Sequence, residues 1–374
     1  MLYNLFSWQI YKKSKQRRDN WGIFRAFFIT FADENALPVK TNTFFVIHFA
    51  LFALLLFANI LWGSLSIPID ATWHILCGKA VDAHPSWSAI IWEGRVPQAV
   101  TAALCGASLS CCGLLLQTLF RNPLAGPSIL GIDSGANLGV ALVMLTGTGI
   151  FLHASSFVLV VTAAMMGALA TMLLLLVMNR FLRNDIMLLI TGVIISSVAG
   201  SLIQLLNFSA TEEGVHNFII WGMGNFSAVS MDRLPLFVIL SVCGLLGATL
   251  LVKPLDTLLL GETYATNLGT NVNRVRTMLL VVTGILTATT VAFCGPISFL
   301  GLAVPHIARL ALRSSSHRIL LPAAMLVGAC LTLLCNLAST LPTSGGVIPI
   351  NVLTPIIGAP VILYVIFHHN KIAS

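Results

Sequence analysis

Long apolar runs separated by short polar segments fill most of the chain from residue 43 onward. A helix that crosses a bilayer needs roughly 20 predominantly apolar residues, and runs close to this length recur. The pattern predicts an all-α polytopic membrane protein with a ten-helix domain over residues 43–374. The predicted spans lie at about residues 43–62, 96–119, 128–147, 154–179, 186–207, 234–252, 277–293, 303–313, 319–340 and 352–367.

Proline and glycine interrupt the apolar pattern at two places. In a bilayer, irregular backbone is tolerated only where protein buries it or where it borders a water-filled cavity. The first broken stretch, 117–137, is therefore either a turn between two spans or part of a functional centre. It contains the helix-breaking residues Asn122-Pro123, Gly126-Pro127, Gly131 and Gly135. The second, 295–302, leads into the span that contains Pro305.

The two broken stretches share a short sequence echo, GPSILG at residues 126–131 and GPISFLG at residues 295–301. In the predicted topology the first copy lies on the inner side of the membrane and the second on the outer side. An inverted repeat would produce this arrangement, so we predict one. A further apolar segment, Thr211 to Ser230, is too short to span and is interrupted by Gly222 and Gly224. Its length predicts a re-entrant or interfacial helix.

The composition agrees with a membrane protein: 57% of residues are hydrophobic and only 9% are charged, against roughly 25% charged residues in soluble domains. The net charge of +7 is not a nucleic-acid signal, because Lys and Arg mark cytoplasmic loops. Ten spans with both termini cytoplasmic place seventeen of the twenty Lys and Arg inside, leaving only Lys79, Arg95 and Arg233 outside. The basic segment 1–42 is predicted to be a solvated cytoplasmic tail rather than a surface helix.

Ionisable residues within the spans are few. Asp133 lies in the first broken stretch and is expected to cap a helix start. We expect His306 to be hydrogen-bonded inside the bundle, and Arg309 is close enough to a helix end to snorkel. No ladder of carboxylates is present to carry ions, which argues against a stand-alone coupled transporter.

The sequence contains no GxxxxGK[ST] loop, HExxH or GxSxG motif, so neither ATP hydrolysis by that route nor an enzyme is favoured. The eight cysteines form no CxxC pair, and those in apolar runs fit small buried hydrophobes. No metal site or cofactor is predicted in this chain.

The polar segment 253–276 is predicted to be cytoplasmic and to contain a short helix. Leu260, Thr263 and Tyr264 fall at helical spacing, Gly261 can open the helix, and Gly269 can end it in a left-handed turn. Such a knob could fit a groove on a partner protein, or it could be a capped loop without a partner.

Several motifs converge in one order: RVPQAV (95–100), GLLLQTLFRNPLAGPSILGIDSGA (113–136), LGETYATNLG (260–269), GPISFLGLAVPHIARL (295–310) and VIPINVLTPIIGAPVILYVI (347–366). Together they resemble the permeases of iron–siderophore, haem and cobalamin ABC importers. The resemblance covers about residues 45–368. Its family motif positions here are Asn122, Pro123, Gly131, Gly135, Pro305, His306 and Arg309.

The resemblance implies a bacterial inner-membrane protein in which two permease copies form a homodimer and enclose a path between them. Two ATPase subunits, which carry ATP and magnesium, would bind the cytoplasmic face, and a periplasmic or lipid-anchored substrate-binding protein would dock outside. Arg95 resembles a docking arginine. The ATPase-coupling residues would be Leu260, Gly261, Glu262, Ala265, Leu268 and Gly269. The path residues would be Gln204, Asn207, Asn217 and Trp221.

Several positions depart from the family pattern: Gln98 and Thr340 stand where arginines are frequent, Gly126 replaces an acid, and Val347 stands in place of another acid. These changes put charge-pair docking in doubt. The substrate expected from the resemblance is a metal chelate, a ferric siderophore first and haem or cobalamin next. A stand-alone secondary transporter and a bundle-forming scaffold are the alternatives from other classes.

Overall fold

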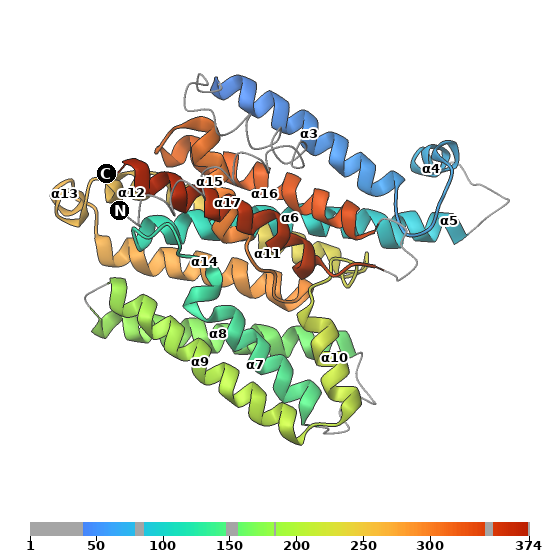
Figure 1. Ribbon diagram of the computed structural model, residues 1–374, viewed down its shortest axis with the longest axis horizontal. Helices are drawn as coiled ribbons and strands as arrows, with labels where there is room; N and C mark the ends of the chain where they lie inside the picture. The colour runs from blue at the N-terminus through green and yellow to red at the C-terminus, as the bar shows by residue number, and fades with distance from the viewer. Residues whose placement is uncertain (1–39, 79–85, 147–155, 183–184, 341–346, 373–374) are drawn as a thin grey trace, which may run out of the picture.

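The computed structural model describes residues 40–78, 86–146, 156–182, 185–340 and 347–372, and within these ranges the chain is helical, without β-strands (Figure 1). Most of the basic N-terminal segment, 1–39, lies outside the described residues. The helices are α3 (Thr41–Leu61), α4 (Ile69–Leu76), α5 (Ser86–Ala89), α6 (Val96–Leu119), α7 (Ile132–Leu145), α8 (Ser156–Phe181), α9 (Asp185–Ser209), α10 (Glu212–Gly222), α11 (Leu234–Leu250), α12 (Val252–Leu259), α13 (Glu262–Asn267), α14 (Val272–Cys294), α15 (Leu300–Leu312), α16 (His317–Ser339) and α17 (Ile350–Ile372). A π-helix, η1 (Ile90–Arg95), and a 3₁₀ turn, η2 (Pro127–Leu130), complete the set.

The prediction of an all-α membrane protein is confirmed, whereas the count of ten spans stays a prediction. Six helices in the described ranges are long and apolar enough to cross a bilayer, and α11 with α12 makes a seventh if this pair, bent by 47°, is one span. The other three predicted spans correspond to shorter apolar helices, α7, α15 and the described part of α17. The short segment after α9 is helical as expected: α10 has 11 residues.

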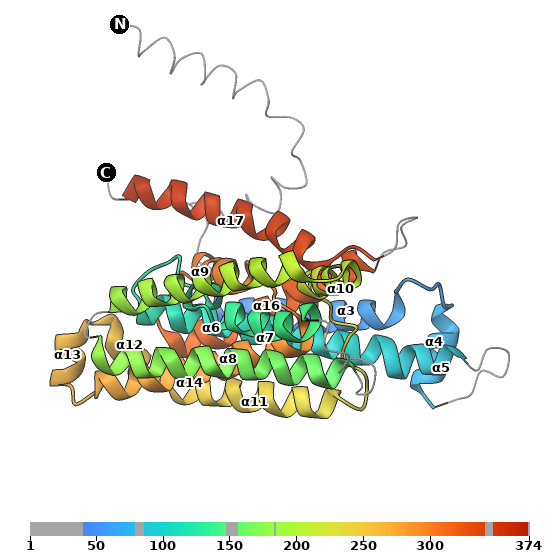
Figure 2. The same ribbon diagram turned by 90° about the horizontal axis from the view of Figure 1, so that it is seen from below.

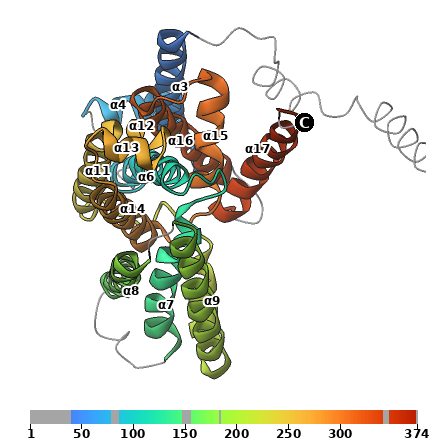
Figure 3. The same ribbon diagram turned by 90° about the vertical axis from the view of Figure 1, so that its left-hand side faces the viewer.

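Helix α6 is the centre of the bundle. In the end-on view it lies among α11, α14, α15 and α16 (Figure 3), and it packs against each of them. In its most apolar window 89% of the residues are buried. Its many Ala, Ser, Cys and Gly residues let neighbouring backbones approach closely, as is typical of helix contacts in membranes.

Helices α7, α8 and α9 form a second group beside this centre (Figures 1 and 3). They pack against one another, and α14 packs against both α6 and α8, which joins the two groups. Helix α9 is the least buried candidate span, with 17% of its apolar window buried. Its outer face must therefore be covered by lipid or by another chain.

The two ends of the bundle carry different short helices. Figure 2 shows α12 and α13 at one end and α4 and α5 at the opposite end. The predicted cytoplasmic knob and the segment between the first two predicted spans, which the ten-span topology places outside, are thus separated by the length of the bundle.

The half-length helices α7 and α15, of 14 and 13 residues, each follow a broken stretch. From there they run toward opposite ends. Gly214, near the start of α10, packs against the carbonyl of Met144 near the end of α7. Arg309 of α15 lies instead in a cavity with Leu258 of α12. This opposite direction agrees with the inverted repeat, which stays a prediction.

Candidate functional site

The first broken stretch begins where α6 ends. Asn122 forms an Asx turn, in which its Oδ1 accepts a hydrogen bond from the backbone N–H of Leu124 at 2.9 Å. Gly131 takes a left-handed conformation with φ of 76° and starts α7. A side chain at Gly135 would overlap Gly167 and Thr171 of α8, so glycine there permits the close packing of α7 on α8.

The second broken stretch begins at Gly295, which ends α14 with φ of 76°. Phe299, also left-handed with φ of 68°, then starts α15. Left-handed backbone at a non-glycine residue is uncommon and costs energy that the surrounding structure must offset.

Two side chains of α15 hold the second stretch to the first. His306 Nε2 lies 2.8 Å from the carbonyl oxygen of Pro123. Arg309 Nη1 donates to Gln117 Oε1 at 2.6 Å. The prediction for His306 is confirmed. The Arg309 guanidinium binds an amide of α6, and its snorkelling to the membrane surface stays a prediction.

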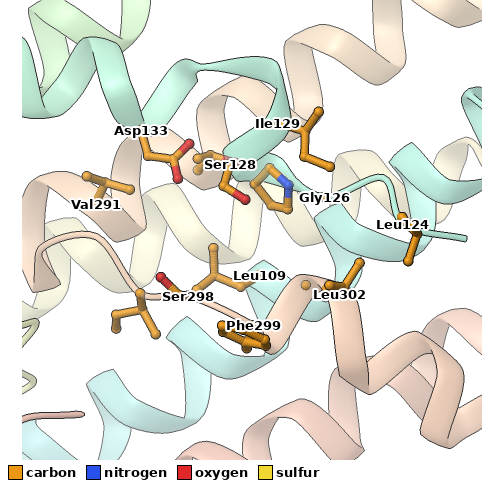
Figure 4. Close-up of a pocket in the computed structure, with 14 residues that line it drawn as sticks. Leu109, Leu124, Gly126, Ser128, Ile129, Asp133, Val291, Ser298, Phe299 and Leu302 are labelled. Atoms are coloured by element: carbon orange, nitrogen blue, oxygen red, sulfur yellow. The ribbon is translucent and has the colours of Figure 1, made fainter. Parts of the chain in front are cut away.

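A cavity of about 270 Å³ lies between the two broken stretches (Figure 4). The figure shows Ser128 and Asp133 on one side and Ser298 and Phe299 on the other. The irregular backbone therefore borders a cavity, as expected of broken helices in a bilayer. Gly131, not Asp133, stands at the N-cap position of α7; Asp133 lies in the first turn, and its Oδ1 is buried without a hydrogen-bond partner among the described residues.

Asn351 connects three places where a helix begins or ends, a role that the sequence did not indicate. Its Nδ2 donates to the carbonyl oxygens of Gly222 at 3.1 Å and Pro296 at 2.6 Å. Its Oδ1 accepts from the N–H of Ser298 at 3.1 Å. The end of α10, the second broken stretch and the start of α17 therefore meet at one amide. No local pattern could have indicated partners so distant in sequence.

The four predicted path residues lie on α9 and α10, and none of them lines this cavity. Gln204 and Asn217 are exposed, whereas Asn207 and Trp221 are half-buried. Helices α9 and α10 thus present these polar groups away from the cavity between the broken stretches, and their role in a path stays a prediction.

The knob, residues 260–269, has the predicted form. Gly261 precedes α13 with φ of 104°, and Gly269 follows it with φ of 83°. The N–H of Gly269 donates to the carbonyl of Thr266, and the N–H of Thr270 donates to that of Ala265. This pair of bonds is a Schellman motif, which requires a left-handed residue at the helix end.

Three large apolar side chains are exposed on the knob. Ala265 is fully buried, whereas Leu260, Tyr264 and Leu268 are 61%, 68% and 64% exposed. Glu262 pairs with Arg276 of α14 at 3.4 Å, which joins α13 to the bundle. Large apolar side chains gathered on an otherwise polar tip are typical of a protein-binding surface.

Arg95 is placed differently from the expectation of an outward-facing docking charge. It ends η1 and is 6% exposed. Its guanidinium donates to the carbonyl oxygens of Ile60 at 3.0 Å, Leu61 at 2.7 Å and Leu65 at 2.5 Å. A cation at the carboxyl end of α3 also complements the helix dipole. Pairing with an acidic partner residue would require these three hydrogen bonds to be replaced.

Gln98 and Thr340, two positions nearby that depart from the family pattern, form hydrogen bonds within the chain. Gln98 Nε2 donates to Asn336 Oδ1 at 2.9 Å, and Asn336 Nδ2 donates to Asn59 Oδ1 at 2.8 Å. Thr340 donates to the carbonyl of Asn336 at 3.1 Å. This chain of amides joins α6, α16 and α3. Among the described residues no group of three or more His, Cys, Asp or Glu side chains could hold a metal ion.

The model of the FecCD transport family matches residues 51–368. The vitamin B12 import system permease protein BtuC of Vibrio cholerae is 34% identical over 303 residues, covering 79% of this chain and 90% of that protein. The uncharacterized ABC transporter permease protein YvrB of Bacillus subtilis is 32% identical over 335 residues, covering 87% of this chain and 94% of that protein.

A solved structure of a metal-chelate type ABC transporter in an inward-facing conformation has the same fold. It is 30% identical in sequence, with a TM-score of 0.73, and the match covers 86% of this chain and 99% of that one. The similarity therefore extends over the bundle, both broken stretches and the knob.

Proposed function

Because the chain belongs to the FecCD transport family, we propose that it is the permease subunit that carries a metal chelate across the bacterial inner membrane, with both termini in the cytoplasm. That it is an ABC-importer permease follows from the family. The chelate, the orientation and the assembly are the proposal. The observation that carries it is the 34% identity over 303 residues with a vitamin B12 import permease.

A corrinoid of the cobalamin type is the first substrate to test, because several of the similar permeases are named for vitamin B12 import. The ferric siderophore favoured by the sequence is the second, and the similar metal-chelate type transporter supports this wider class. Both are bulky chelates of a transition metal.

We propose that two copies of the chain form the path. The cavity within one copy is about 270 Å³, below the roughly 300–1,000 Å³ of pockets that enclose drug-sized ligands. Most residues of α9 are not buried. The predicted path residue Gln204 is exposed on α9, and Asn217 is exposed on α10. A second copy facing α9 and α10 would enclose a larger space between polar side chains.

The partners follow from the two ends of the bundle. The exposed Tyr264 and Leu268 on the knob supply an apolar tip for the groove of an ATPase subunit, which would hold ATP and magnesium. At the opposite end a substrate-binding protein would dock on the region of α4 and α5. Arg95 is already hydrogen-bonded within the chain, so this docking is proposed to depend on other groups.

The experiment is uptake into proteoliposomes that contain the chain with the ATPase and binding protein that co-purify with it from native membranes. Labelled cyanocobalamin, a ferric hydroxamate and haem are offered separately, with and without ATP. ATP-dependent uptake of cyanocobalamin alone supports the corrinoid, and uptake of the ferric hydroxamate alone supports the siderophore. Transport of none of the three by an assembled complex would contradict the proposal.

A variant separates the importer from a stand-alone transporter. Glu262→Gln weakens the ion pair of α13 with Arg276 while leaving the span helices unchanged. The importer is expected to lose ATP-driven uptake and keep its fold. A transporter that works alone would be nearly unaffected.

A further inference from the structure

Helix α16 begins without a cap of its own. Ser316 stands at its N-cap position, yet its side chain makes no capping hydrogen bond. The missing acceptor comes from another helix: Asp256 Oδ1, on α12, accepts from the backbone N–H of His317 at 2.8 Å. A carboxylate at a helix N-terminus satisfies a free donor and complements the helix dipole. Helix α12, in the polar segment 253–276, thus caps the start of α16.

The same carboxylate binds the side chain of His317. Nδ1 of the imidazole lies 2.8 Å from Asp256 Oδ1, and Nδ1 must donate because an ionised carboxylate only accepts. His317 is 1% exposed, whereas Asp256 is 36% exposed. The pair therefore connects the surface of α12, at Asp256, with the buried interior, at His317.

The far side of His317 reaches α6. Its Nε2 lies 2.7 Å from Thr118 Oγ1, in a buried contact. Thr118 is next to Gln117, which binds Arg309 of α15 and also donates to the carbonyl of Leu302 at 3.2 Å. Thr118, the last residue in this series of hydrogen bonds, is thus adjacent to Gln117, which binds the second broken stretch and α15.

We propose that Asp256, His317 and Thr118 form a relay of positioning residues through which movement of the knob is passed to the ends of α6 and α15. The relay rests on the proposed function, because it needs an ATPase that moves the knob. It joins three helices, α12, α16 and α6, by two hydrogen bonds to one imidazole. An apolar contact of the same size could slide, whereas these bonds have fixed direction and length.

The test measures substrate molecules transported per ATP hydrolysed in the reconstituted complex. Asp256→Ala, His317→Gln and Thr118→Val are each expected to lower this ratio about three- to tenfold, the fold-change that corresponds to the net free energy of one hydrogen bond. The KM for ATP stays unchanged, and Thr118→Ser keeps the wild-type ratio. Thr249→Val is the matched control, because the hydroxyl of Thr249 bonds only within its own helix, to the carbonyl of Leu246.

Combination of two substitutions distinguishes a relay from separate structural contacts. Residues that act as one chain do not add, so Asp256→Ala with His317→Gln is expected to be no worse than either change alone. An unchanged ratio in the three variants, a multiplied loss in the double variant, or an equal loss in Thr249→Val would overturn the relay.

Hydrogen exchange of the purified chain tests the relay without transport. Asp256→Ala, or Asp256→Asn if the alanine variant does not assemble, is expected to speed exchange at residues 316–320 and also at the end of α6, 117–121. Faster exchange at 316–320 alone would overturn the relay. A wild-type complex that transports nothing contradicts the proposed function, and the exchange result still decides the relay.

Discussion

At the scale of residues, pairs of glycines bring backbones of neighbouring helices close together. A side chain at Gly113 of α6 would overlap the carbonyl of Gly301 at the start of α15, and one at Gly106 would overlap that of Gly328 in α16. Each glycine pair lets the backbone of α6 touch the backbone of a neighbouring helix. The second broken stretch is held in place by one of these contacts.

Gly113→Ala is therefore expected to destabilise the chain by about 1–3 kcal/mol or more, because backbone atoms must move to admit the methyl group. Thermal unfolding in mild detergent measures the effect. Gly200→Ala on α9 is the matched control, since no atom lies within 4 Å of the added group. The control should be neutral or slightly stabilising, and equal behaviour of the two variants would contradict the contact.

Asn351 allows a prediction in which two similar variants differ. Asn351→Ala leaves the carbonyls of Gly222 and Pro296 without their donor and should cost about 1–3 kcal/mol. Asn351→Asp should cost more, because a carboxylate would face two carbonyl oxygens. Asn273→Ala, at an exposed position of α14, should change little. An aspartate variant as stable as the wild type in the same unfolding assay would refute this role.

The residues that the sequence could identify are those whose role is local. Gly261 and Gly269 were predicted correctly because a helix end and a left-handed turn depend on neighbours within a few positions. Arg95 and Gln98 were expected to concern docking, yet they bind groups 30 to 238 positions away. A charge pattern along the chain does not contain such distances, so the inward turn of these side chains could not be predicted.

At the scale of elements, the short helices carry the distinctive surfaces. Sequence periodicity predicted α10 and α13 as short helices, because glycine marks their ends. It could not show that α7 and α15 start at one cavity, since this depends on how the bundle closes. Helix α13 presents Tyr264 and Leu268 to solvent at the tip of the molecule, while Ala265 anchors it.

We expect Tyr264→Ser and Leu268→Ser each to weaken binding of the ATPase subunit by about tenfold, because exposed aromatic and apolar anchors dominate such interfaces. Surface plasmon resonance with the purified ATPase measures the affinity. The unfolding temperature of the chain should not fall, since both side chains are exposed. Met231→Ser, exposed before α11, is the control. Unchanged affinity in both knob variants would place the ATPase elsewhere.

At the scale of the whole molecule, the bundle has two chemically different ends. The knob lies at one end and the helices α4 and α5 at the other (Figure 2). The excess of Lys and Arg predicts that the knob end is cytoplasmic.

Thiol labelling of intact cells tests this orientation. Cys77 is exposed at the end of α4 and should react with a membrane-impermeant maleimide added outside. In a Cys77→Ser background, Thr263→Cys on α13 should react only after the membrane is permeabilised. The reverse pattern would invert the topology and contradict the assignment of the knob to the ATPase.

The cap that Asp256 gives to α16 also has a consequence for the synthesis and membrane insertion of the chain. The two residues are 61 positions apart, so Asp256 leaves the ribosome first and remains unpaired while α14 and α15 are inserted. When α16 follows, its first turn gains this acceptor only once α12 lies beside it. The hydrogen bond between α12 and α16 can thus form only after the intervening helices have been inserted in the correct order.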